Sequence, residues 1–281
     1  MTEYATIRVE RERGVAFVTI DHPPINLLDA ALVGDLARLQ GELSDDDATR
    51  VVVFRSADPE FFVAHADAAM IQSLPREASA AAAALVGFHG FMERWRTLDQ
   101  ITMAQLEGRT RGGGSEFALA LDLRFAAIGR AVLGQPEVAL GIIPGAGGTQ
   151  RLARLLGRAR AIEVVVGCGD VDAALAERYG WVNRALPADE LGPFVARLAH
   201  RIASYPPHAV RLAKRAIDAA AAGFDAGLAA ERDAFGECMA DPDLDARFEG
   251  ALARGVQTRD GELDLHAALD ATLDAYGGHR A

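Results

Sequence analysis

Several residue types and patterns that mark other protein classes are scarce or absent in this chain of 281 residues. The two cysteines, Cys168 and Cys238, are too few for a disulfide framework and show no metal-ligand spacing, which indicates a reducing compartment. The seven histidines are scattered without ligand spacing, so no metal site is expected. No apolar run is long enough to span a membrane, and the N-terminus lacks the basic and apolar stretches of a signal peptide. We therefore expect a cytoplasmic protein with no membrane partner.

Positive charge is also in short supply. Lys214 is the only lysine, and the formal net charge is −11, so the cationic surface that nucleic acid requires is not expected. A small phosphorylated ligand is still compatible with this charge, because a few arginines or a helix N-terminus can hold one. The apolar share of 50% and the charged share of 25% are typical of a globular protein with a sizeable core.

The first half of the chain alternates between strand and helix patterns. A hairpin is expected from β-branched, alternating runs on either side of Gly14, and residues 51–54 read as a strand covered on both faces. Helices are expected over residues 30–43 and 79–97, and the strands are expected at residues 6–10, 15–20, 51–54, 101–106 and 123–127. This alternation predicts a mainly parallel α/β core.

From Gly148 onward the sequence predicts helices and no further strands. The expected helices cover about 148–156, 159–166, 172–179, 189–203, 207–221 and 224–239, with a final amphipathic helix at 263–276. We therefore divide the chain into an α/β core with the active site, residues 1–203, and a helical region, residues 204–281.

Two glutamates, each preceded by turn-forming residues, are the most informative feature. Gly112, Gly113 and Gly114 lead into Glu116 on the first turn of an apolar helix, while Glu137 follows Gly-Gln-Pro and precedes a second glycine-rich turn. The glycines could simply form tight turns, and the two carboxylates could cap backbone N–H groups. Alternatively, bare backbone could donate to a ligand oxygen while the acids move protons, which is what chemistry at an activated carbonyl requires.

Common cofactor patterns do not fit these glycines. The Gly145 to Gly148 segment lacks the third glycine of a dinucleotide fingerprint, and no Gly-Lys-Ser/Thr closes the run from Gly108 to Gly114. No metal or redox cofactor is therefore expected.

Taken together, these motifs resemble the crotonase (enoyl-CoA hydratase/isomerase) superfamily over nearly the whole chain, and are closest to enoyl-CoA hydratase. The matching stretches are residues 22–28, 61–67, 108–122, 135–152 and 180–183. The resemblance implies a spiral of repeated ββα units with a C-terminal helical region that forms homotrimers, commonly paired into hexamers. It also implies a trans-2-enoyl-CoA thioester as substrate.

The resemblance assigns roles to individual positions. The backbone N–H groups of Ala66 and Gly113 match the oxyanion hole that stabilises the thioester enolate oxygen. Glu116 matches the base that activates a water molecule, and Glu137 matches the acid that delivers a proton to Cα. Because the two carboxyl groups share one water, we do not expect both to be ionised.

Further positions match the part of the site that binds substrate. Ala64 and Asp67 lie in the loop that contacts the adenine and pantetheine of CoA, and Gly112 and Gly145 belong to the same binding set. His65 stands where the family usually has glycine. It could be a surface variation, or it could contact the CoA phosphates or crowd an unusual acyl group.

An aromatic stripe and two alternative activities complete the sequence-based picture. Phe88, Phe91 and Trp95 recur at helical spacing, which favours a core face, although the matching helix of the family can line the acyl pocket. Because both acids are present, we rank hydration to a 3-hydroxyacyl-CoA first and a single-acid isomerase second. A CoA-binding protein without catalysis remains a third alternative, since fold does not fix function.

Overall fold

A six-stranded sheet forms the centre of the protein, in the order β1-β2-β3-β5-β7-β10. The computed structural model describes residues 3–205, 207–218, 232, 233, 235, 236, 238–265, 267–269, 271 and 272. The strands of this sheet are β1 (Ile7–Glu12), β2 (Val15–Ile20), β3 (Val51–Ser56), β5 (Ile101–Leu106), β7 (Leu123–Ala127) and β10 (Arg184–Leu186). β1 and β2 form the expected antiparallel hairpin, and every other pair in the sheet is parallel. The prediction of a mainly parallel α/β core is therefore confirmed.

A smaller sheet of four short strands packs beside the first, in the order β4-β6-β8-β9. Its strands are β4 (Phe61–Val63), β6 (Arg109–Arg111), β8 (Val132–Gly134) and β9 (Val171–Asp172). The prediction that strands stop at Gly148 is wrong, because β9 and β10 both lie beyond it. These two strands have only two and three residues, too few for an alternating pattern to show in the sequence.

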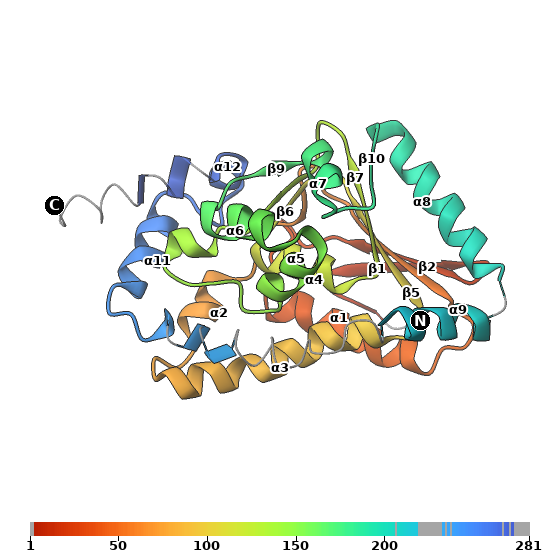
Figure 1. The fold of residues 1–281 in the computed structure, drawn as a ribbon, viewed down its shortest axis with the longest axis horizontal. Helices are drawn as coiled ribbons and strands as arrows, with labels where there is room; N and C mark the ends of the chain where they lie inside the picture. The colour runs from red at the N-terminus through yellow and green to blue at the C-terminus, as the bar shows by residue number, and fades with distance from the viewer. Residues whose placement is uncertain are drawn as a thin grey trace.

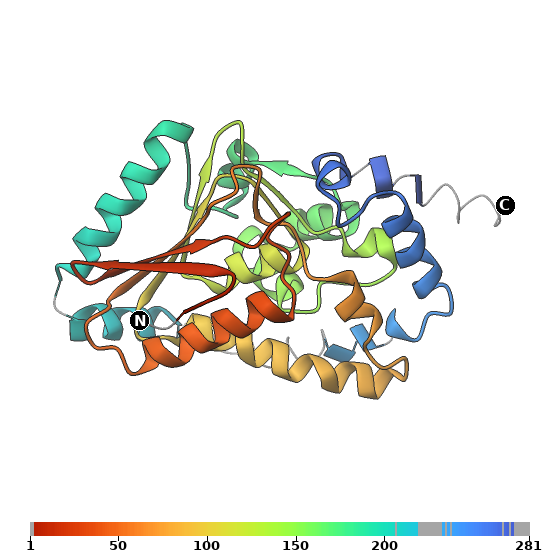
Figure 2. The same cartoon turned by 180° about the vertical axis from the view of Figure 1, so that it is seen from behind.

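Helices cover both faces of the large sheet (Figures 1 and 2). On one face, α8 (Ala188–Ala203) packs its buried residues against Val51, Val53 and neighbouring side chains. On the other face, α1 (Ala30–Ser44), α3 (Ala78–Thr97) and α4 (Gly112–Ala120) pack against Val52 and Phe54. All four residues from Val51 to Phe54 are fully buried, so the expectation of a strand covered on both faces is confirmed.

The remaining helices follow the sequence-based expectation only in part. They are α2 (Ala68–Gln72), α5 (Gly148–Leu156), α6 (Arg158–Gly167), α7 (Ala173–Tyr179), α9 (Pro207–Asp218), α11 (Leu244–Ala253) and α12 (Arg259–Leu263), with the 3₁₀ turn η1 (Glu137–Leu140). α5, α6, α7 and α9 match expected helices, whereas α2, α11 and α12 were not expected. Most of the helix predicted for 224–239, and the ends of those predicted for 207–221 and 263–276, lie outside the described residues. The domain division at residue 203 stays a prediction.

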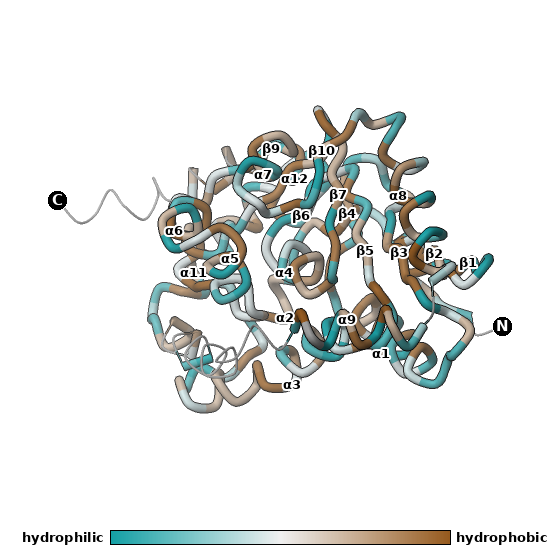
Figure 3. The backbone as a smooth tube through the Cα atoms, turned by 45° about the vertical axis from the view of Figure 1, so that its right-hand side comes forward, coloured by the Kyte–Doolittle hydropathy of each residue, from teal (hydrophilic) through white to brown (hydrophobic). Residues whose placement is uncertain are grey.

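Helix α4 lies near the middle of the molecule, among hydrophobic stretches of the sheets (Figure 3). Every one of its residues is buried. Its C-terminal carbonyls, including those of Ala118 and Leu121, accept hydrogen bonds from the buried Arg124 guanidinium. Burial lowers the pKa of Arg124 to about 10, so this group is still a cation at neutral pH and suits the negative end of the helix. The C-terminal end of α4 is thereby fixed relative to β7, which carries Arg124.

Helices α11 and α12 lie at one end of the molecule, where α11 contacts α2 and η1 (Figure 1). Within the ranges that the structure describes, no helix has the length and apolar character needed to cross a membrane.

Candidate active site

The N-terminus of α4 packs directly on the loop after β4, and this contact requires glycine. A Cβ atom on Gly114 would lie 2.2 Å from the carbonyl oxygen of Val63, and one on Gly113 would lie 2.8 Å from the Cβ of Ala66. Gly112 adopts a left-handed φ of +48°, which disfavours a side chain as well. The three glycines therefore allow α4 and the loop after β4 to pack this closely, and the donation of their backbone N–H groups to a ligand oxygen stays a prediction.

This contact places the backbone nitrogens of Ala66 and Gly113 next to each other. The Gly113 Cβ position lies 3.2 Å from the Ala66 nitrogen. Neither N–H has a hydrogen-bond acceptor among the described residues, and Gly113 lies in the first turn of α4, where N–H groups lack helical partners. The arrangement is a pair of donors that can both reach one ligand oxygen.

Glu116 is held by the second glycine-rich turn. Its Oε1 accepts hydrogen bonds from the N–H groups of Ala146 at 2.7 Å and Gly148 at 2.8 Å. A Cβ on Gly148 would lie 2.9 Å from the same carboxylate oxygen, so only glycine lets the turn approach this closely. The side chain is 3% exposed, and two donors on one oxygen fix its orientation.

Two buried side chains, neither of them predicted from the sequence to support the site, hold this turn in place. His89 of α3 lies with its Nε2 2.8 Å from the carbonyl oxygen of Gly145. Arg151 of α5 donates to the carbonyl of Ala146 at 2.7 Å and pairs with Glu93 at 2.5 Å. Each sits at ordinary helical spacing, so no local pattern could have identified it.

Glu137 opens η1 and is 9% exposed. With the Gln135 amide oriented so that its donors meet acceptors, the side-chain nitrogen lies 3.1 Å from each oxygen of Glu137. Gln135 is fully buried, so this contact orients the carboxylate. This role of Gln135 was not predicted from the sequence, because it depends on a side-chain contact that spacing alone does not specify.

Both glutamates line one cavity, which we call the glutamate cavity. The N–H pair of Ala66 and Gly113 lines it too, as does Gly145. The rest of its wall is mainly apolar: Met70, Ile71, Leu74, Ala84, Leu85, Phe88, Ile142, Ile143, Ala146 and Phe235. The structure therefore brings the predicted catalytic and oxyanion positions together around a single space.

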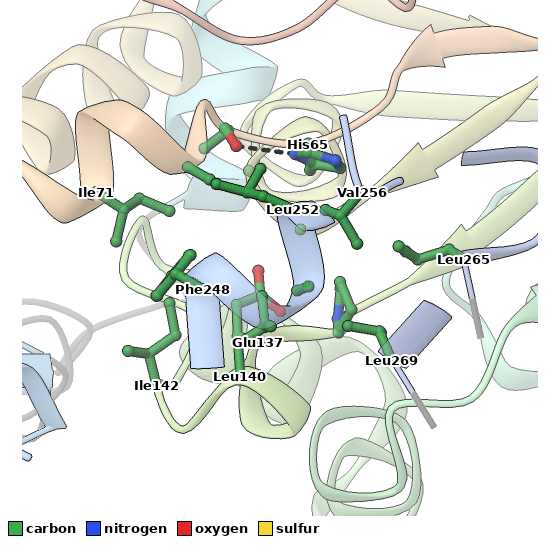
Figure 4. Close-up of a pocket in the computed structure, with 16 residues that line it drawn as sticks. His65, Ile71, Glu137, Leu140, Ile142, Phe248, Leu252, Val256, Leu265 and Leu269 are labelled. Carbon is green, nitrogen blue, oxygen red and sulfur yellow. Dashed lines mark hydrogen bonds between the residues drawn. The ribbon is translucent and has the colours of Figure 1, made fainter. Parts of the chain in front are cut away.

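A second cavity adjoins the first, and we call it the C-terminal cavity. It shares Ala66, Gly113 and Glu137 with the first but is not lined by Glu116. Figure 4 shows Glu137 facing Phe248, Leu252, Leu265 and Leu269 of the C-terminal region across this space.

The predicted CoA-contacting positions have varied surroundings. Ala64 is fully buried and packs with Ile25 and Phe61, while Asp67 caps α2 by accepting from the N–H of Ala69. His65 is 9% exposed and lies 2.6 Å from a carboxylate oxygen of Glu262. The alternative that His65 is a surface variation is therefore wrong. Its φ is not positive, so this position does not depend on glycine.

The aromatic stripe of α3 is divided between the core and the site. Phe91 and Trp95 are 3% and 0% exposed and belong to the main core, as expected for a core face. Phe88 instead lines the glutamate cavity, as the alternative interpretation predicts. No group of three or more His, Cys, Asp or Glu side chains suited to a metal ion occurs among the described residues.

Comparisons with known proteins point to one family. Residues 10–253 match the family described as "Enoyl-CoA hydratase/isomerase". The chain is 35% identical to a short-chain-enoyl-CoA hydratase of Clostridium acetobutylicum, over 86% of this chain and 92% of the relative. It is also 35% identical to a crotonyl-CoA hydratase of Syntrophomonas wolfei, over 85% and 92%.

Solved structures show the same similarity. A putative enoyl-CoA hydratase from Streptomyces avermitilis superposes with a TM-score of 0.88 and 42% identity, over 96% of this chain and 99% of that one. An enoyl-CoA hydratase from Bacillus anthracis superposes with a TM-score of 0.72 and 33% identity, over 90% and 97%.

Proposed function

The chain belongs to the enoyl-CoA hydratase/isomerase family, and on that premise we propose that it adds water to a trans-2-enoyl-CoA to give a 3-hydroxyacyl-CoA. The observation that carries this proposal is the single cavity lined by Glu116, Glu137 and the N–H pair of Ala66 and Gly113. An isomerase needs only one acid, whereas this site presents two against the same pair of donors.

In the proposed reaction, the thioester carbonyl oxygen accepts hydrogen bonds from Ala66 and Gly113. Glu116 takes a proton from water while the water oxygen bonds to Cβ. The electrons of the carbon–carbon double bond move toward the carbonyl, which becomes an enolate. Glu137 then gives a proton to Cα. The product has gained one water, and the proton taken by Glu116 balances the one released by Glu137. Loss of one N–H donor in such a site costs about 10²–10³ in rate.

The lining of the two cavities indicates how the substrate lies. Because Glu116 lines only the glutamate cavity, Cβ has to lie there, and the acyl chain continues from Cβ along Met70, Leu85 and Phe88. The sulfur side of the thioester then faces the C-terminal cavity and the loop that carries Ala64, His65 and Asp67. We propose this loop as the CoA-contacting wall.

The test is hydration of crotonyl-CoA, followed by loss of the absorbance of its conjugated thioester. Glu116→Gln and Glu137→Gln should each lower kcat by about 10²–10⁴, the usual contribution of a general acid or base. Glu163→Gln is the matched control, because Glu163 pairs with Tyr179 at the surface and should leave kcat unchanged. Double-bond migration from a 3-enoyl-CoA without hydration would select the isomerase. If the protein showed neither activity but bound CoA tightly, a CoA-binding role without catalysis would be selected.

We propose that the reaction uses no metal or redox cofactor and that the protein is cytoplasmic. We also propose a homotrimer or hexamer that assembles through the region after residue 203. Light scattering on the purified protein tests the assembly: a mass of one chain or two chains would contradict it.

A further inference from the structure

The C-terminal segment 255–265 lies on the loop that carries the Ala66 donor. Leu263 packs against Ile25, Phe61 and Ala64. Arg259 pairs with the carboxylates of Asp58 and Glu60. A stretch from near the end of the described chain therefore covers the back of the predicted oxyanion loop.

The centre of this contact is a buried pair, His65 and Glu262, 197 residues apart in the sequence. His65 Nε2 lies 2.6 Å from Glu262 Oε1, and His65 Nδ1 lies 2.9 Å from the carbonyl oxygen of Ala66 (Figure 4 shows His65 beside the cavity). The same Glu262 oxygen accepts the N–H of Gln257 at 2.7 Å, and Glu262 is fully buried. The histidine thus connects the oxyanion loop to the C-terminal segment.

Both ring nitrogens of His65 face acceptors, which only the doubly protonated ring can satisfy. Burial lowers the pKa of His65, but the negative charge and hydrogen bond of Glu262 outweigh it and raise the pKa above its ordinary value. Burial raises the pKa of Glu262, but the charge and hydrogen bond of His65, the N–H of Gln257 and the charge of Arg111 together outweigh this and lower the pKa. The pair is therefore an imidazolium and a carboxylate.

Other charged groups surround the pair. Arg111 donates to the carbonyl oxygen of Glu262 at 3.0 Å, and its charge disfavours the imidazolium while it favours the carboxylate. Arg111 is itself paired with Asp170 at 2.6 Å. Arg109 also acts on Glu262 through its charge, and Glu137 lines the same cavity as His65.

We propose that His65 and Glu262 are positioning residues, which fasten the C-terminal segment to the oxyanion loop and aim the Ala66 N–H at the thioester oxygen. The backbone carbonyls before and after the Ala66 N–H are both held in place. The carbonyl of His65 accepts a hydrogen bond from the N–H of Leu28, and the carbonyl of Ala66 lies against the His65 ring. The loop then has little freedom to turn the N–H away. This inference rests on the proposed function for its kinetic consequences.

The kinetic test compares Glu262→Gln with Arg259→Gln in crotonyl-CoA hydration. Glu262→Gln should lower kcat about tenfold or more with KM within about threefold, because small misplacement of a donor costs rate more than binding. Arg259→Gln loosens the same segment without touching the loop, so its kcat should stay within about twofold. Equal effects of the two variants, an unchanged kcat in Glu262→Gln, or a loss confined to KM would each overturn the proposal.

Two further readouts separate positioning from simple stabilisation. The alkaline limb of the kcat profile should move to lower pH in Glu262→Gln, since a neutral amide no longer holds the His65 proton. The double variant His65→Gln with Glu262→Gln removes both buried charges, so its thermal stability should recover relative to Glu262→Gln while kcat stays low. Recovery of kcat together with stability would contradict a positioning role.

An NMR measurement tests the pair without turnover. In ¹⁵N-labelled protein, the His65 ring should lose its second proton at a higher pH in the wild type than in Glu262→Gln. Binding of acetyl-CoA, which carries a thioester but no double bond, should shift the Ala66 and Gly113 amide signals, and Glu262→Gln should reduce only the Ala66 shift. A wild-type protein that hydrates no enoyl-CoA refutes the proposed function. A His65 ring that loses its proton at the same pH in the wild type and in Glu262→Gln refutes the pair.

Discussion

The two predicted oxyanion donors lie on walls that are held in different ways. The Gly113 wall is the first turn of α4, fixed by backbone packed against the carbonyl of Val63 with no room for a side chain. The Ala66 wall is a loop fixed by side chains, His65 to Glu262 and Asp67 to Gln257, from a segment about 190 residues later. The first wall depends on glycines that have no side chain, and the second depends on a long-range ionic contact. We expect the first to fail by steric clash and the second to respond to pH.

The largest expected effect follows from filling the first wall. In Gly114→Ala the new Cβ would lie 2.2 Å from the Val63 oxygen and 2.8 Å from the Val63 Cβ, so β4 and α4 have to separate. We expect a loss of about 2–3 kcal/mol in the free energy of unfolding, typical of overpacking, and a loss of kcat of about 10² or more. Urea unfolding and crotonyl-CoA hydration measure the two effects.

A matched glycine in α3 provides the control. A Cβ on Gly87 meets nothing within 4 Å, so Gly87→Ala should stabilise the helix by about 0.5–1 kcal/mol and leave kcat unchanged. If Gly114→Ala behaved like Gly87→Ala, the close approach of the first wall would not matter for the reaction.

The same contrast explains which parts of the site could be predicted from the sequence. The Gly113 wall is local: three glycines directly precede the Ser115-Glu116 pair, so the spacing alone places bare backbone and acid on one helix turn. The second wall depends on Glu262, which stands in a polar stretch whose sequence carries no sign of a partner. A contact between residues this far apart is decided by the fold, and a single sequence does not reveal it.

Elements of secondary structure divide along similar lines. Long periodic segments such as α3 and α8 were predicted to within a residue or so, because many apolar positions repeat along one face. The short strands β9 and β10 were missed, since each depends on a neighbouring strand rather than on its own pattern. Gln135 was missed for a related reason: its orienting role depends on a side-chain contact that spacing alone does not specify.

The second wall should show itself in the pH dependence of stability. His65 has a raised pKa in the folded state. Its contribution to the free energy of unfolding is therefore complete below its ordinary pKa of about 6.5 and is lost as pH rises through its pKa in the folded protein. Glu262 has a lowered pKa in the folded state. Its contribution to the free energy of unfolding is therefore complete above its ordinary pKa of 4.5 and is lost as pH falls through its pKa in the folded protein. The ionic pair therefore stabilises the folded protein most where both contributions are complete.

The measurement is urea unfolding of the wild type and of the His65→Gln, Glu262→Gln double variant from pH 4 to 9. The free-energy difference between them should be largest between about pH 4.5 and 6.5 and should decline on either side, because the two ordinary pKa values bound this window. A difference that stays constant across this range would mean that the pair is not ionised in the folded protein.

The smallest effect is expected where the C-terminal segment touches Asp67. Gln257 has a left-handed φ of +69°, and its Nε2 donates to Asp67 Oδ1 at 3.2 Å. Asparagine tolerates this backbone better than glutamine but is too short to reach Asp67, so Gln257→Asn should change the free energy of unfolding by about 0.5 kcal/mol or less. Because Glu262 still holds His65, kcat should fall no more than about twofold. A loss of kcat as large as that of Glu262→Gln would mean that the whole segment, rather than the ionic pair, positions the Ala66 wall.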